Sequence, residues 1–131
     1  MRRFGIFRDK SVETTVDDIL KSRARSRIYV YLLRKKGAMT EDIIRGTKLH
    51  PSTVRETLSK MYHEKQIYRK KIKNSNIGKN PYIYYPISPI ELLKRYTAEI
   101  ENRLNKLASL AYRDEIKNYK PVKINIQEKM Y

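Results

Sequence analysis

The chain has 131 residues, of which 30 are Lys or Arg and 14 are Asp or Glu, so its formal net charge is +16. This length supports one domain with an appendage, and a charged fraction of 34% argues against a membrane span. The absence of Cys excludes disulfides, a thiolate metal site and a Cys nucleophile. A field this positive attracts polyanions, with nucleic acid the first candidate and anionic lipid the second.

Residues 1–14 are predicted to form a basic arm, which carries Arg2, Arg3, Arg8 and Lys10 around three apolar residues. Two interpretations stay open: an arm that enters a minor groove, or an ordinary frayed terminus or strand laid on a partner. The apolar run is too short for a signal peptide, so we expect a cytoplasmic, nucleoid-associated protein. Thr14 or Thr15, with an Asp three residues later, resembles a capping box that opens a short helix through Leu20.

The segment SRARSRIYVYLLRKKG, residues 22–37, predicts the next helix, and Gly37 is expected to end it. Its core-facing positions follow the helical spacing i, i+4, i+7 and i+8: Ala24, Ile28, Tyr31 and Leu32. Three arginines near the helix start oppose the macrodipole, which indicates either phosphate contacts or a solvated face. The residues that follow, Ala38 and Met39, are expected to form a brief strand.

Residues 40–64 read as a helix-turn-helix. Thr40 is the expected N-cap of the first helix, Gly46 its exit, and Leu49 the plug of the turn. Pro51 suits the first turn of the second helix, where its missing N–H costs nothing. Val54, Leu58 and Met61 give this second helix an apolar face.

The opposite face of the second helix carries the residues expected to meet DNA. Small hydroxyl residues permit close approach to a groove, while Arg and Lys reach phosphates or base edges. A solvated amphipathic helix is the plain alternative for this segment alone. The candidate contacts are Ser52, Thr53, Arg55, Glu56, Ser59 and Lys60.

A basic hairpin follows directly, as strand, turn and strand over residues 67–87. Placed after a recognition helix, such a hairpin is a wing. From Lys48 to Lys79 there are nine bases against two acids, hence +7 on one unit, whereas a merely soluble surface would mix both signs. The wing residues predicted to contact DNA are Arg69, Lys70, Lys71, Lys73 and Lys79.

Residues 18–87 resemble archaeal winged helix-turn-helix regulators of the ArsR and TrmB types. The resemblance is carried by ILKSRARSRIYVYLL and by MTEDIIRGTKLHPSTVRETLSKM, in which PSTV opens the recognition helix. It implies a winged helix-turn-helix domain over residues 15–87 whose recognition helix, residues 51–64, and wing contact DNA. With no Cys and only His50 and His63, a metal-sensing site of the ArsR type is not expected, nor is any cofactor or small-molecule effector.

Residues 88–118 predict a long C-terminal helix, opened by Ser88 as N-cap, Pro89 at the first position and Glu91 completing a capping box. Its apolar stripe favours a coiled-coil-like homodimer, with packing on the chain's own domain as the alternative. The tail, residues 119–131, alternates three apolar residues and is either a short strand or disordered. The stripe comprises Leu93, Tyr96, Ile100, Leu104, Leu107 and Leu110.

No catalytic constellation or metal-ligand spacing is present, so an enzyme is not expected. The fold class predicted is mainly α (α+β), a winged helix-turn-helix domain with a dimerisation helix. The leading function is a homodimeric, double-stranded DNA-binding regulator. Two alternatives stay open: an architectural protein that coats DNA with little base readout, and a winged helix that serves as a protein-interaction module of the transcription machinery.

Overall fold

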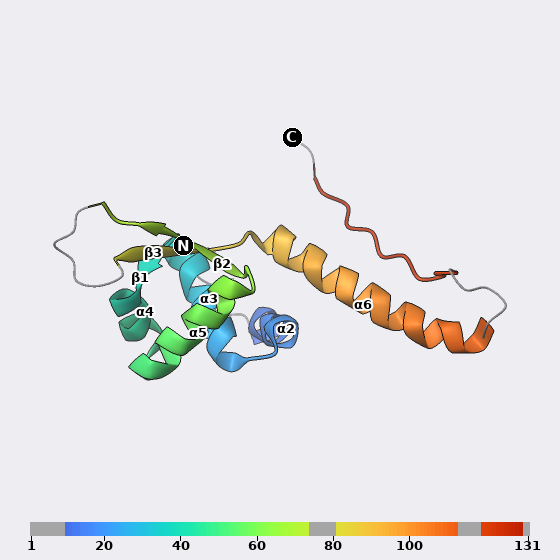
Figure 1. The fold of residues 1–131 in the computed structure, drawn as a ribbon, viewed down its shortest axis with the longest axis horizontal. Coiled ribbons are helices and arrows are strands. Elements are labelled where there is room, and N and C mark those ends of the chain that lie inside the picture. Colours follow the sequence, from blue (N-terminus) through green and yellow to red (C-terminus); the bar gives the residue numbers. More distant parts are fainter. Residues whose placement is uncertain (1–9, 74–80, 113–118, 130–131) are drawn as a thin grey trace. The chain divides into compact units, whose positions relative to one another are not determined.

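The computed structural model describes residues 10–73, 81–112 and 119–129, in a chain that divides into two compact units, residues 1–87 and 88–131. The second unit holds α6 (Pro89–Tyr112) and an extended tail. The predicted α+β class with a long C-terminal helix is confirmed. The first unit contains α2 (Lys10–Leu20), α3 (Arg23–Lys35), β1 (Ala38–Met39), α4 (Thr40–Thr47), α5 (Pro51–His63), β2 (Ile67–Lys71) and β3 (Tyr82–Pro86) (Figure 1).

The three strands form one antiparallel sheet in the order β1-β3-β2. Ala38 lies opposite Tyr84 in the β1–β3 pair, and Arg69 lies opposite the same tyrosine in the β2–β3 pair. The expected short strand at Ala38 and Met39 therefore pairs with the wing. This pairing joins the wing to the start of α4, because β1 runs directly into that helix.

Helix α3 lies at the centre of the core and contacts α2, α4, α5 and β3. Ile28, Tyr29 and Leu32 on α3 are fully or almost fully buried. The predicted apolar face of α5 is confirmed, since its three members are buried as well. The remaining core side chains come from the surrounding elements and include Ile43, Val54, Leu58, Met61, Ile67 and Tyr84.

Four helices of the first unit are each followed by a lysine in the left-handed conformation: Lys21, Lys36, Lys48 and Lys65, with φ between 58° and 60°. A residue with a side chain pays for this conformation, whereas glycine does not. A lysine at this position places its positive charge near the negative end of the helix dipole. The expected exit at Gly46 is therefore wrong, because α4 continues to Thr47 and Lys48 is its C-cap.

Two expected helix starts are also wrong. Helix α2 already includes Lys10, so it does not begin at Thr14 or Thr15, and residues 10–14 of the predicted arm are helical. The N-cap of α4 is Met39, which makes no side-chain capping bond, and Thr40 lies inside the helix. Residues 1–9 of the predicted arm lie outside the described residues.

Gly46 serves packing instead of helix termination. A Cβ atom at this position would overlap the aromatic ring of Tyr31, a buried residue of α3. Glycine is otherwise unfavourable in a helix interior by about 0.8–1 kcal/mol relative to alanine. The sequence tolerates that cost because only a residue without Cβ lets α4 approach the Tyr31 ring this closely.

We expect Gly46→Ala to lower the free energy of unfolding by about 1–2 kcal/mol, because overpacking of roughly 1–3 kcal/mol exceeds the gain in helix propensity. Urea denaturation measures this change in the free energy of unfolding. In a Tyr31→Leu background, which removes the ring, the same substitution should be neutral or stabilising. Thr14→Ala, at an exposed position of α2, is the control for propensity alone. A more stable Gly46→Ala single variant would contradict this account.

Helix α6 begins as expected at Pro89, with the Ser88 hydroxyl accepting a hydrogen bond from the Glu91 N–H at 3.1 Å. The reciprocal half of the predicted capping box is replaced, because the Glu91 carboxylate instead accepts from Arg95 at 3.3 Å. Residues 113–118, the end of the predicted helix, lie outside the described residues.

Over residues 119–129 the tail does not pair as a β-strand, and its backbone is held against α6 by hydrogen bonds. Its extended backbone runs antiparallel along α6 (Figure 1). The buried amide of Asn105 donates to the Val122 carbonyl at 3.0 Å and accepts from the Val122 N–H at 2.9 Å. Glu101 accepts from the Ile124 N–H at 2.8 Å, and Lys94 pairs with Glu128 at 2.7 Å. Side chains of α6 thus satisfy backbone groups of the tail that a neighbouring strand would bond in a β-sheet.

Two further observations concern the described residues as a whole. None of their helices combines the length and the apolar character needed to cross a bilayer. Within the same ranges, no three His, Asp or Glu side chains gather in a way that could hold a metal ion.

Candidate nucleic-acid interface

Helix α5 presents the predicted polar face to solvent. Ser52, Arg55, Glu56, Ser59 and Lys60 are exposed, and Thr53 is partly buried. The helix starts at Pro51, as expected. Because Val54, Leu58 and Met61 anchor the opposite face in the core, the helix cannot rotate without exposing them. The orientation of the polar face is therefore set by burial.

His50 caps α5, a role that the sequence interpretation missed. Its Nδ1 accepts a hydrogen bond from the Ser52 N–H at 3.2 Å and lies 2.9 Å from the Ser52 hydroxyl oxygen. Histidine is an uncommon N-cap, so the residue type alone gave little signal. Its position directly before Pro51 was the available clue. The cap also holds the Ser52 side chain, the first predicted DNA contact, beside the helix start.

The two predicted cations of α5 each face a carboxylate. Arg55 Nη2 lies 3.8 Å from Glu41 on α4, and Lys60 Nζ lies 3.4 Å from Glu56 one turn earlier. All four side chains are more than half exposed. Exposed ion pairs of this kind contribute about 0–1 kcal/mol to stability. An incoming phosphate or base can therefore replace the carboxylate partner of Arg55 or Lys60 at little cost in free energy.

The wing supplies a second set of bases. Lys70, Lys71 and Lys73 are exposed, while Lys79 falls in residues 74–80 and lies outside the described part. Because side chains alternate along a strand, Lys70 and Lys71 point to opposite faces of the hairpin. Lys70 lies over the Tyr85 ring, with Nζ 5.6 Å from the ring centre. A polyanion beside this hairpin can therefore meet positive charge on either face.

Arg69, one of the wing residues predicted to contact DNA, packs against two aromatic rings. Its guanidinium carbon lies 3.9 Å from the ring centre of Tyr62 on α5 and 4.1 Å from that of Tyr82 on β3. The side chain is partly buried. A planar cation stacks on aromatic faces in this way, whereas an ammonium does so less well. Arg69 thus links α5 to the wing.

The end of α5 is fixed from the other side by Arg25 of α3. The Arg25 guanidinium donates to both carboxylate oxygens of Glu64, at 2.7 and 3.0 Å, and to Gln66 at 3.2 Å. These hydrogen bonds lower the pKa of the Glu64 carboxyl below its ordinary value. Arg25 is therefore a structural partner of α5, a use that the sequence analysis did not consider for the α3 arginines.

We expect Arg69→Lys to lower the free energy of unfolding by about 1 kcal/mol, although the charge is kept, because a lysine loses the flat contact with both rings. Denaturation in urea measures the difference. Arg45→Lys is the matched control, since Arg45 is exposed and paired only with Asp42. If both variants are as stable as the parent, Arg69 does not hold the wing to α5.

The apolar stripe predicted on residues 88–118 lies on α6 and is called the α6 stripe from here on. It remains largely uncovered. Leu93, Leu104, Leu107 and Leu110 are 38%, 42%, 65% and 73% exposed, and Tyr96 and Ile100 are partly buried. The tail bonds to Lys94, Glu101 and Asn105. At about 100° per residue, the centre of these positions lies about 130° around the helix from the centre of the stripe. The tail therefore does not cover the stripe.

The fold has a solved counterpart. A possible transcriptional regulator from Methanosarcina mazei Go1 superposes with a TM-score of 0.65 at 19% sequence identity, over 80% of this chain and 89% of that one. A likeness at this identity establishes a shared fold. No protein-family model matches the sequence, and no curated protein sequence matches it significantly.

Proposed function

We propose that the chain is a double-stranded DNA-binding transcriptional regulator that acts as a homodimer. Helix α5 enters the major groove, and the wing, residues 67–87, lies along the backbone or minor groove. The observation that carries the proposal is the helix α5 itself: its apolar face is locked in the core, its polar face is exposed, and a basic hairpin is tied to its end. An α-helix presented in this manner fits the width of the B-DNA major groove.

Several observations support the assignment of roles. The α5 cations are held only by exposed ion pairs, which leaves them available for base edges. The wing lysines are suited to phosphates, which they contact as point charges. The resemblance of residues 18–87 to archaeal ArsR and TrmB regulators agrees with this division of labour, and so does the description of the structural counterpart as a possible transcriptional regulator.

The homodimer is supported by the α6 stripe. Four leucines on one face of a 24-residue helix are more than one-third exposed. Burying a large apolar side chain gains about 1.5–3 kcal/mol relative to leaving it in water. A second copy of the same helix offers an equivalent stripe, so two-fold packing covers both. Two recognition helices then read a pseudo-palindromic site with half-sites about one helical turn apart or a multiple of it.

An architectural protein is the second candidate, and the net charge of +16 favours it. Such a protein binds through phosphates and DNA deformability, without base contacts. Glu56 on the exposed face of α5 argues for readout instead, because a carboxylate there repels phosphates yet accepts a hydrogen bond from cytosine N4. Selection of binding sites from random DNA decides between the two.

Affinity for duplex DNA should depend steeply on salt. If a dimer neutralises on the order of 8 phosphates, log affinity falls with log salt at a slope near −7. Fluorescence anisotropy with a labelled duplex, repeated over a range of salt concentrations, measures the slope. A nearly flat response would overturn the proposal and favour a protein-interaction module.

A further inference from the structure

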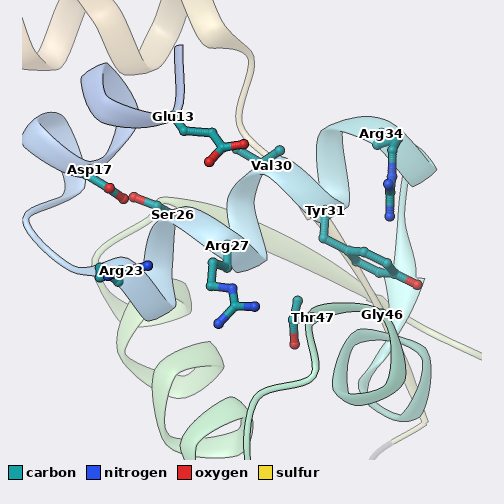
Figure 2. Close-up of a pocket in the computed structure, with 10 residues that line it drawn as sticks. All are labelled: Glu13, Asp17, Arg23, Ser26, Arg27, Val30, Tyr31, Arg34, Gly46 and Thr47. Atoms are coloured by element: carbon teal, nitrogen blue, oxygen red, sulfur yellow. The ribbon is translucent and has the colours of Figure 1, made fainter. Parts of the chain in front are cut away.

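A cavity of about 410 Å³ lies in the first unit, between α2, α3 and the end of α4 (Figure 2). This volume is at the small end of the range for ligand pockets in proteins, about 300–1,000 Å³. None of its lining residues belongs to the predicted DNA-contacting set. The lining comprises Glu13, Asp17, Arg23, Ser26, Arg27, Val30, Tyr31, Arg34, Gly46 and Thr47.

The two helical walls of the cavity carry opposite charge. Helix α2 contributes Glu13 and Asp17, and α3 contributes Arg23, Arg27 and Arg34 (Figure 2). Among the described residues, no ion pair joins these two walls, because the ion pairs that form involve other side chains. Cations and carboxylates therefore face the same space with a gap between them.

A buried hydroxyl also opens on this space. Ser26 is only 4% exposed, and its Oγ has no hydrogen-bond partner within the part of the chain that the structure describes. A buried polar atom left without a partner is costly, and most such atoms in folded proteins are satisfied by protein, water or ligand. Ser26 lines the cavity, so a molecule inside it can supply the missing partner.

We propose that this cavity binds a small zwitterion of the α-amino-acid type. A simple anion would suit the arginines but be repelled by Glu13 and Asp17, and a simple cation would meet the reverse conflict. A molecule with a carboxylate and an ammonium group satisfies both walls, with the carboxylate toward the α3 guanidinium groups. Tyr31 and Val30 provide the apolar contact for its side chain, and Ser26 provides a hydrogen bond.

The cavity is also connected to the helix-turn-helix turn. Thr47, 5% exposed, donates its hydroxyl to the Ile43 carbonyl at 2.6 Å and accepts from the Leu49 N–H at 3.4 Å. A ligand that contacts Thr47 can therefore shift the turn between α4 and α5 and with it the position of α5. Resting on the proposed DNA-binding function, the inference extends to regulation: the bound zwitterion changes DNA affinity by about 5-fold or more, the usual size of allosteric coupling.

The binding test uses the full chain without DNA. Each of the twenty L-α-amino acids is titrated at millimolar concentration, and amide shifts are followed by ¹⁵N NMR. We expect at least one to shift the amides of α2, α3 and Thr47 saturably. Its N-acetyl derivative, which lacks the cation, and its methyl ester, which lacks the carboxylate, should each bind at least 10-fold more weakly. No saturable shift with any of the twenty, or equal binding of either derivative, overturns the proposal.

Variants locate the site. Arg27→Gln and Glu13→Gln should each weaken the amino acid at least 10-fold, and Ser26→Ala should weaken it several-fold. Asp18→Asn removes a charge from the same helix without lining the cavity, so it should bind as the parent does. The NMR spectrum of each variant reports its folding. Loss of binding in Asp18→Asn equal to that in Glu13→Gln would overturn the assignment of the site.

DNA affinity is then measured with and without the amino acid. A change of about 5-fold that Arg27→Gln abolishes supports the regulatory inference. Unchanged DNA affinity with the ligand bound overturns regulation and leaves a binding site. If the amino acid binds but the chain has no affinity for duplex DNA, the proposed function fails while the cavity assignment stands.

Discussion

Placing two aspartates in the α6 stripe, Ile100→Asp with Leu107→Asp, should convert the proposed dimer to a monomer and weaken binding to a two-half-site duplex by about 10²–10⁴-fold. The loss is large because a dimer places its second recognition helix at high effective concentration once the first has bound. Sedimentation measures the mass, and anisotropy with one-half-site and two-half-site duplexes measures affinity. Binding to a single half-site should change little.

The control for this pair is Asn102→Asp with Ser109→Asp. Both positions are exposed on α6, and they add the same two charges away from the stripe. This variant should sediment as the parent does. If the stripe variant also sediments as the parent, the stripe is not the interface. If it is monomeric yet binds two half-sites as tightly, dimerisation has no part in recognition.

Arg55→Ala should relax the preference at a particular base pair, by about 1–3 kcal/mol if the guanidinium contacts guanine with two hydrogen bonds. That is about 5- to 150-fold in discrimination. Affinity is measured for a selected site and for its single-base variants. Arg45→Ala is the matched control, because Arg45 is also an exposed helical arginine paired with a carboxylate. It should leave base preference unchanged.

Lys71→Ala gives the contrasting result. As a wing lysine suited to phosphate, Lys71 should contribute equally to all sequences, so its removal weakens binding uniformly and makes the salt slope shallower by about one. Equal losses on selected and random DNA for Arg55→Ala would instead favour the architectural protein. The pair of substitutions therefore separates positioning on the DNA backbone from readout of the bases.

Arg69 and Arg25 each make a contact that a count of charges does not reveal. Arg69 was one of nine bases between Lys48 and Lys79, but it lies between two tyrosine rings. Arg25 was considered for phosphate contact, but it holds Glu64 with two hydrogen bonds. Both partners come from other elements of the fold. No hydrophobic periodicity or charge count indicates which elements meet, so only the folded arrangement shows these contacts.

The helix ends show the same division. Ser88 and Pro89 start α6 as predicted, because a hydroxyl cap and a proline act within one turn of each other. Gly46, in contrast, was expected to end α4. It serves packing instead, because the ring of Tyr31 occupies the space that a Cβ atom would need. Terminal lysines in the left-handed conformation took the role expected of glycine. Local chemistry predicts a cap, and tertiary contacts decide where a helix stops.

The sequence alone predicts the helix-turn-helix, the short strand at Ala38 and Met39, and the buried and exposed faces of α5. Burial of apolar residues at helical or alternating spacing is a local signal that survives folding. Folding establishes the rest: the tail binds α6, Arg69 joins α5 to the wing, and Ser26 and the charged walls of α2 and α3 line a cavity. These depend on polar groups distant in sequence, and no periodicity encodes which of them meet.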